Sequence, residues 1–218
     1  MKRYMLAAIA AVVGVGSFAQ AATVFNTDVT GGWNPPGNNG QPNGNFKVET
    51  VGSGTTLVEL GLRAQLRTVG PIADSDLNGV YSAPAGGFGP SAPLFAKWNF
   101  DYSVVLGANS GVTRVELKID TNPSSALTAF TTLFSDVPST LPGQPFIPQN
   151  SLNMGMTFLN LPSFDFNAVG VYDFQLIAFG TGNAVLNSVA IQVEVIPLPL
   201  ASTAGMALVG MMGLRRRA

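Results

Sequence analysis

Apolar and polar side chains alternate in short runs through the middle of the chain. The clearest run covers residues 95–106, where the apolar positions 96, 98, 100, 102 and 104 alternate with polar ones at 97, 99, 101 and 103. A period of two is typical of a strand with one face on a core. Residues 112–119 alternate likewise, and we expect the charged face of Arg114, Glu116 and Lys118 to be solvated.

Two pairs of such runs are joined by sequences typical of tight turns. Residues 46–51 and 56–67 flank Gly52-Ser53-Gly54, and residues 171–179 and 184–195 flank Gly180-Thr181-Gly182-Asn183. Because Gly and Asn accept the positive φ angles of hairpin turns, each pair is predicted to form a hairpin. No stretch between residues 22 and 196 has the period of an amphipathic helix, so we predict an all-β domain.

Three segments interrupt the strand pattern, namely residues 26–45, 74–93 and 135–154. They are rich in Gly, Pro and Asn. We predict long loops there, which in compact domains are often functional.

The composition removes several classes of protein. Only 11% of the 218 residues are charged, and the chain has neither Cys nor His, so it has no disulfide, no thiolate ligand and no imidazole base. Residues 22–196 hold six basic and twelve acidic side chains, a net charge of −6. Because nucleic-acid binding requires a basic surface, we expect no nucleic-acid partner.

The N-terminus has the layout of a secretory signal peptide. Lys2 and Arg3 precede an apolar run over residues 5–15 and the small-residue site Ala19-Gln20-Ala21. Signal peptidase is expected to cleave between Ala21 and Ala22 after export. The alternative, an uncleaved anchor helix, requires about 20 apolar residues.

The C-terminus combines a proline pair, an apolar stretch and a basic cluster. Pro197, Leu198 and Pro199 precede apolar residues 203–214, and Arg215, Arg216 and Arg217 follow. Residues 200–214 would form a transmembrane helix of about 22 Å, short of the roughly 30 Å hydrocarbon core, with the arginines held in the cytoplasm. We therefore predict a temporary anchor.

This tail resembles the PEP-CTERM class of bacterial sorting signals, in its Val-Pro-Leu-Pro-Ala (VPLPA-CTERM) variant. The sequence departs from the variant by an inserted Ile196 and by Leu200 in place of Ala. The resemblance implies a Gram-negative exporter, recognition by an exosortase-type membrane protease and removal of the basic helix. An ordinary anchor that is never processed is the alternative. The body, at residues 59–64, 98–101 and 149–151, also resembles exported bacterial proteins with the same tail, which implies no activity.

Residues 170–174 are similar to the tyrosine-corner region of immunoglobulin-like sandwiches, with Phe174 where antibody domains carry a Cys. We therefore expect an immunoglobulin-like two-sheet β-sandwich, with helices only in the signal peptide and the C-terminal tail. Its core is predicted to centre on Trp98, Phe100, Tyr102 and Phe174.

Residues 74–79 match the opening of a calcium loop, in which alternate oxygen ligands converge on the ion. Asp74, Asp76 and Asn78 are the candidate ligands, but the position of the closing Glu holds Ala85. A polar turn explains the same residues and is the interpretation that we favour. We therefore expect no metal and no cofactor, with weak calcium binding as the alternative.

Asp101 and Asp173 are the best candidates for the carboxylate pair of a glycosidase, a hydrolase type that needs neither His nor Cys. Each is flanked by aromatic residues, and in a sandwich their strands are candidate neighbours. We favour the alternative, that both are solvated carboxylates on an acidic sheet face. No catalytic residue and no enzyme activity is therefore predicted.

Trp33 lies among asparagines, a setting in which an exposed indole would form a platform for sugar rings. The alternative, which we favour, is a buried Trp that plugs the end of the core.

The sequence thus predicts three parts: a signal peptide (1–21), a β-sandwich domain (22–196) and a sorting signal (197–218). We expect a structural or interaction role, without catalysis, at the cell surface or in the extracellular polysaccharide. A carbohydrate-binding module is the alternative, and a glycoside hydrolase is a third class. Predicted partners are signal peptidase, an exosortase-type protease and extracellular polysaccharide.

Overall fold

The strands form two large sheets and one small sheet in a computed structural model that describes residues 21–36, 41–88, 95–120, 122–123, 130–138, 146–159, 165 and 167–197. Within these ranges the only helical elements are three single 3₁₀ turns, Gly54–Thr56, Thr157–Leu159 and Thr181–Asn183. The described part of the chain is therefore an all-β domain, as the alternation predicts.

Sheet A is antiparallel and has the strand order β1 (Ala22–Thr27), β2 (Phe46–Val51), β3 (Val58–Leu66), β8 (Trp98–Leu106) and β11 (Gln149–Leu152). A short strand, β4 (Gly70–Pro71), pairs with the end of β3. The predicted β2–β3 hairpin is confirmed, because Val51 pairs with Val58. Its turn requires a glycine at position 52, where φ is +73° and a Cβ would lie 2.5 Å from the Thr56 carbonyl oxygen.

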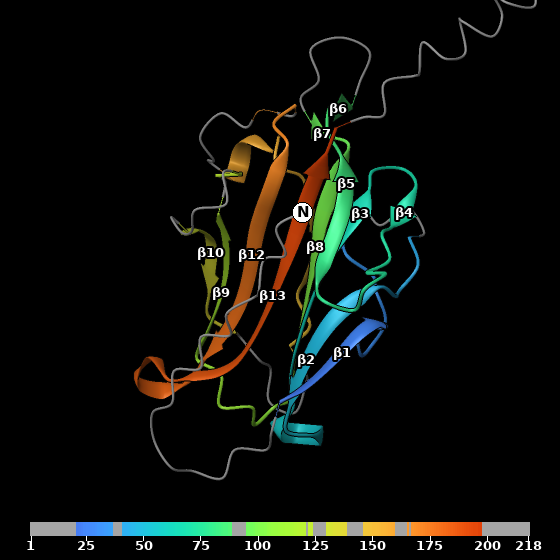
Figure 1. Ribbon diagram of the computed structural model, residues 1–218. Helices are drawn as coiled ribbons and strands as arrows, with labels where there is room; N and C mark the ends of the chain where they lie inside the picture. The colour runs from blue at the N-terminus through green and yellow to red at the C-terminus, as the bar shows by residue number, and fades with distance from the viewer. Residues whose placement is uncertain are drawn as a thin grey trace, which may run out of the picture.

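Sheet B has the strand order β10 (Phe130–Asp136), β9 (Arg114–Asp120), β12 (Gly170–Phe179), β13 (Val185–Ile196) and β5 (Val80–Pro84). The predicted β12–β13 hairpin is confirmed, and β13 lies between β12 and β5 (Figure 1). The β13–β5 pair is parallel, whereas the other pairs in this sheet are antiparallel. The small sheet pairs β6 (Gly87–Phe88) with β7 (Phe95–Ala96).

The core lies between sheets A and B and is rich in aromatic side chains. Phe174 of β12 contacts Phe100 and Trp98 of β8, with ring centroids 4.6 and 6.1 Å apart. These three residues form the centre that the sequence predicts. Tyr102 differs, because it is half-buried and packs on Phe134 at the margin of the core, with ring centroids 5.0 Å apart.

The three predicted loops contain strands, which corrects the sequence analysis. Residues 26–45 begin inside β1, residues 74–93 contain β5 and β6, and residues 135–154 contain the end of β10 and all of β11. β5 turns only Tyr81 and Ala83 toward the core, too few positions for a visible alternation. β11 has a polar sequence because its outward residues contact the polar outer face of sheet A rather than a core.

Both predicted terminal helices lie outside the described residues, together with Ala19, Leu198, Pro199 and Arg215–Arg217. No helix in the described ranges has the length and apolar character needed to cross a membrane. Ala22 is the first residue of β1, and β13 ends at Ile196, directly before Pro197.

Candidate functional site

The outer face of sheet A is covered by residues 28–36 and 41–45, which we call the covering segment. Three polar residues of β3, Glu59, Arg63 and Gln65, point to this face because they alternate with Leu60, Leu62 and Ala64 of the core. All three polar residues are buried. The strand is therefore buried on both sides, by the core on one and by the covering segment on the other.

An ion pair lies at the centre of this face. Arg63 of β3 and Asp101 of β8 are directly opposed in the strand register, with 2.7 Å between Arg63 Nε and Asp101 Oδ2. Arg63 Nη1 also donates hydrogen bonds to the carbonyl oxygens of Pro42 and Gly44, at 2.9 and 2.6 Å. Arg63 thus joins the sheet to the covering segment.

Aromatic rings of the covering segment and β2 pack on the Arg63 guanidinium. Its central carbon lies 4.8 Å from the ring centroid of Trp33 and 4.2 Å from that of Phe46, distances at which a cation is attracted by a ring face. The two rings also contact each other, with centroids 5.1 Å apart. The charge is therefore enclosed by a carboxylate, two carbonyls and two rings.

Burial governs the titration of both partners. It raises the pKa of Asp101 to about 6, against the opposing effect of the Arg63 charge and of hydrogen bonding by Ser151 and Arg63. Burial also lowers the pKa of Arg63, and Asp101 opposes that change. Asp101 is therefore no solvated carboxylate, which corrects the interpretation that the sequence favoured.

Other polar side chains of the sheet hold the covering segment in place. The Glu59 carboxylate accepts hydrogen bonds from the backbone N–H and the hydroxyl of Thr30, at 2.7 and 2.6 Å. Gln149 of β11 donates to the Gly32 carbonyl at 2.7 Å and accepts from the Asn34 N–H at 2.8 Å. The segment is thus tied to β3 and to β11, strands that lie on either side of β8.

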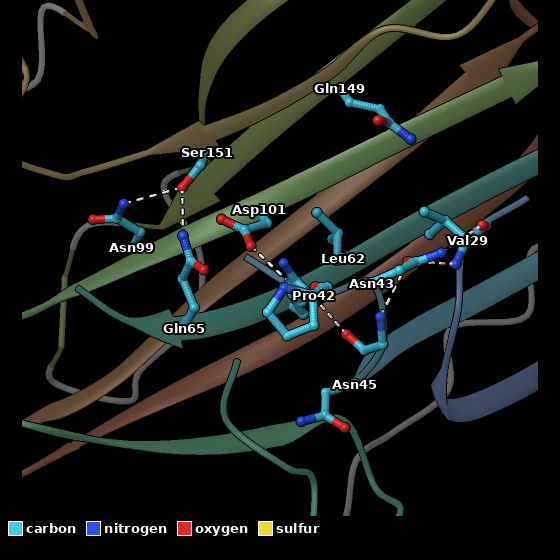
Figure 2. A network of polar contacts seen from close by, with 12 residues as sticks. Val29, Pro42, Asn43, Asn45, Leu62, Gln65, Asn99, Asp101, Gln149 and Ser151 are labelled. Carbon is cyan, nitrogen blue, oxygen red and sulfur yellow. Dashed lines mark hydrogen bonds and ion pairs between the residues drawn. The ribbon is translucent and has the colours of Figure 1, made fainter. Parts of the chain in front are cut away.

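Next to the ion pair, three polar side chains form the floor of a cleft of about 460 Å³. Gln65 Nε2 and Asn99 Nδ2 donate to the Ser151 hydroxyl oxygen, at 2.8 and 3.0 Å, and Figure 2 shows the three side chains converging. Asn153 Nδ2 donates to Asn99 Oδ1 at 2.7 Å. The hydrogen bond from Asn153 fixes the orientation of the Asn99 amide.

The cleft has an apolar wall and a charged rim. Trp33, Pro35, Pro36 and Met156 line it, and Gln41, Arg67 and Thr68 complete the lining. No carboxylate is among the described lining residues. The site therefore offers amides, hydroxyls, one guanidinium and apolar surface.

Trp33 is buried, with 7% of its surface exposed. Its cluster, formed with Val29, Phe46 and Val48, is separate from the core between the sheets. The indole therefore packs on the outer face of sheet A instead of plugging the end of the core. An exposed platform for a sugar ring, the alternative from the sequence, is not present, although Trp33 contributes to the cleft lining.

Asp101 and Asp173 do not share a site. Asp101 lies on β8 of sheet A, whose neighbours are β3 and β11, whereas Asp173 lies on β12 of sheet B between β9 and β13. Both alternate with core aromatics, so they point to opposite outer faces of the sandwich. Asp173 accepts a hydrogen bond from Gln192 at 2.8 Å. The expectation of neighbouring strands is therefore wrong.

The candidate calcium residues form a turn. The buried Asp74 carboxylate accepts hydrogen bonds from the N–H groups of Asn78 and Gly79, at 3.2 and 2.5 Å. Asn78 Oδ1 accepts from the Val80 N–H at 2.9 Å, and Asp76 is exposed. In the described ranges no three His, Cys, Asp or Glu side chains are grouped to hold a metal.

Four residues of the site, Arg63, Gln65, Arg67 and Ser151, were not among the candidates predicted from the sequence. Each holds an outward position of a strand or the following turn, beside an Asn- and Gly-rich segment. The sequence signal that could have indicated this site is Arg63, a charged side chain in the middle of the largely apolar strand β3. Comparison of the chain with protein-family models, curated proteins and solved structures found no match.

Proposed function

We propose that the protein is exported and sorted to the cell surface or the extracellular polysaccharide, where it acts by interaction and not by catalysis. One observation carries this proposal. The predicted signal-peptidase site precedes Ala22, the first residue of β1, and the predicted sorting signal starts at Pro197, directly after β13. Both processing steps would therefore leave every strand of the sandwich intact.

The tail supports delivery by an exosortase-type protease. Its order of Pro197-Leu198-Pro199, apolar residues and Arg215–Arg217 resembles a VPLPA-CTERM signal. Three arginines resist translocation, whereas about 15 apolar residues form a short span. A temporary anchor of this kind would release a surface protein.

We further propose that the sandwich is immunoglobulin-like. Strands β8 and β11 lie in sheet A, as strands B and E lie in one sheet of the immunoglobulin fold. Strands β9, β12 and β13 lie in sheet B, as strands C, F and G lie in the other. Phe100 and Phe174 contact each other across the core where antibody domains join strands B and F by a disulfide. Tyr172 stands two residues before Phe174, the place of the tyrosine corner.

A carbohydrate-binding module is the second candidate, and the polar cleft beside Trp33 favours it. Catalysis by a carboxylate pair lacks comparable support, because Asp101 and Asp173 face opposite sides and Asp101 is ion-paired. The described residues that line the cleft supply donors, acceptors and apolar surface, and none of them is an acid.

Cell fractionation tests the proposed delivery. The full chain is expressed in a strain with an exosortase and in the same strain without it, and intact cells are treated with an external protease. We expect surface-accessible protein in the first strain and membrane-retained protein in the second. Protein confined to the cytoplasm of both strains would contradict export.

A further inference from the structure

The cleft on the outer face of sheet A has the features of a built ligand site. Its volume of about 460 Å³ lies within the usual range for small-molecule sites, roughly 300–1,000 Å³. Its floor consists of Gln65 and Asn99, both at least nine-tenths buried, and of Ser151. Side chains held this firmly are pre-organised for recognition.

One polar atom of the floor has no partner. Gln65 Oε1 is buried and, like Arg63 Nη2 and Asp101 Oδ1 of the neighbouring ion pair, has no hydrogen-bond partner among the described residues, while Nε2 of the Gln65 amide donates to Ser151. Turning the amide over would free the nitrogen instead, so one polar atom of Gln65 is unsatisfied in either orientation. Buried polar groups normally have a partner, and a ligand hydroxyl bonds equally well to an amide oxygen or nitrogen.

At the rim, the Arg67 guanidinium lies on two aromatic rings and has no acidic partner among the described residues. The guanidinium carbon lies 4.4 Å from the ring centroid of Phe95 and 5.2 Å from that of Phe88. The ion pairs among the described residues involve Arg63, Arg114 and Lys118, and not Arg67. A planar, oriented guanidinium is suited to bidentate binding of a carboxylate.

We propose that this cleft binds an acidic saccharide, with Arg67 holding a sugar carboxylate and the floor of Gln65, Asn99 and Ser151 bonding its hydroxyl groups. Pro36, which is exposed, and Met156, which is half-buried, supply apolar surface for the C–H face of a sugar ring. Sugar hydroxyls donate and accept, as do the amides and the hydroxyl of the floor. This inference rests on the proposed function, because an extracellular polysaccharide would supply the ligand.

The test is calorimetric titration of the full chain with trisaccharides of galacturonate, glucuronate or mannuronate, and with maltotriose as the neutral comparison. We expect at least one uronate trisaccharide to bind at least tenfold more tightly than maltotriose. Arg67→Gln should remove that preference. Arg114→Gln is the matched control, because Arg114 also lies on an aromatic ring, that of Phe179, but on sheet B.

Equal losses of uronate affinity in Arg67→Gln and Arg114→Gln would overturn the proposal, since they would indicate binding to positive charge in general. Absence of binding by all three uronate trisaccharides would also overturn it. Circular dichroism and thermal unfolding must show that Arg67→Gln folds as the parent does. The uronate affinity of Thr68→Ala, a smaller change at the same rim, provides a second measurement. Surface delivery is scored separately by protease accessibility, so a chain that reaches the surface without binding uronates would overturn only the ligand.

Discussion

Arg63 and Asp101 are paired twice, once as opposed residues in the β3–β8 register and once as an ion pair with 2.7 Å between Nε and Oδ2. Neither side chain is exposed. Ser151 of β11 lies opposite Asp101 on its other side, so three polar residues cross the sheet in one row. Because the covering segment closes over this row, the pair is shielded from water and each charge depends on the other.

Removal of Arg63 should therefore destabilise the fold severely. Arg63→Met keeps an unbranched side chain but leaves the Asp101 carboxylate buried without its cation. We expect the free energy of unfolding to fall by about 3–5 kcal/mol at pH 7. Urea unfolding followed by fluorescence measures it. Arg114→Met is the control, because Arg114 pairs with Glu116 in a partly exposed site and should cost at most about 1 kcal/mol. Similar losses in the two variants would contradict the assigned role of Arg63.

The pH dependence of stability should carry the sign of a raised carboxyl pKa. The folded pKa of Asp101 is about 6, above the usual 3.8, so between these values the folded state binds a proton that the unfolded state lacks. The contribution of Asp101 to the free energy of unfolding should therefore rise as the pH falls from about 7 to 4.

The double variant Arg63→Met/Asp101→Leu lacks this titration and serves as the reference. Replacement of both charges also avoids an unpaired ion, so the double variant should recover part of the loss seen with Arg63→Met alone. Urea midpoints at several pH values provide the comparison. A parent chain that loses stability relative to the double variant as the pH falls would show that the Asp101 pKa is lowered.

Trp33 should be needed for stability because it encloses the guanidinium and packs on Phe46. We expect Trp33→Ala to lower the free energy of unfolding by about 3–5 kcal/mol. Trp33→Phe, which keeps a ring beside Arg63, should lower it less. Hydrogen exchange of the covering segment in the full chain should rise in the alanine variant. Unchanged stability with weaker saccharide binding would instead indicate that Trp33 acts only on the ligand.

The turn at residues 74–79 should be independent of calcium. The Asp74 carboxylate already accepts two backbone N–H groups, so unfolding temperatures with calcium and with chelator are expected to coincide. Asp74→Ala should lower stability by about 1–3 kcal/mol under both conditions, since it leaves buried donors without an acceptor. Stabilisation that grows with calcium, to about 2.7 kcal/mol at 100 times the dissociation constant, would restore the calcium loop.

The sequence was sufficient for the features that depend on local pattern. Alternation located β2, β3, β8, β9, β12 and β13, and glycine-rich turns identified both hairpins, because these signals involve residues close along the chain. The place of Phe100 and Phe174 in the core also followed, since each lies on the apolar face of its strand, whereas their mutual contact comes from the structure.

The covered face of sheet A was beyond such reasoning. Arg63 and Asp101 are 38 residues apart, and only the β3–β8 register brings them together. Alternation also cannot distinguish a polar face in water from one beneath a folded segment, which is why Asp101 was expected to be solvated. Ser151 joins the site from β11, a strand whose polar sequence resembles a loop.

The charge and the length of the C-terminal tail have opposing effects on its retention in the membrane. Arg215–Arg217 should keep the C-terminus in the cytoplasm, since a charge at the bilayer centre costs several kcal/mol, while a span of about 22 Å is a poor permanent anchor. We expect surface protein to begin at Ala22 and to lack residues beyond 197–202. Intact-mass measurement determines both ends.

Replacement of all three arginines by Ser should impair the C-terminal processing, whereas replacement by Lys, which keeps the charge, should preserve it. The lysine variant separates a requirement for positive charge from a requirement for the arginine side chain itself. Recovery of surface protein that ends at Ala218, in a strain with an exosortase, would establish an unprocessed anchor. In that case the short span would hold the sandwich at the membrane, and the delivery step of the proposed function would be lost.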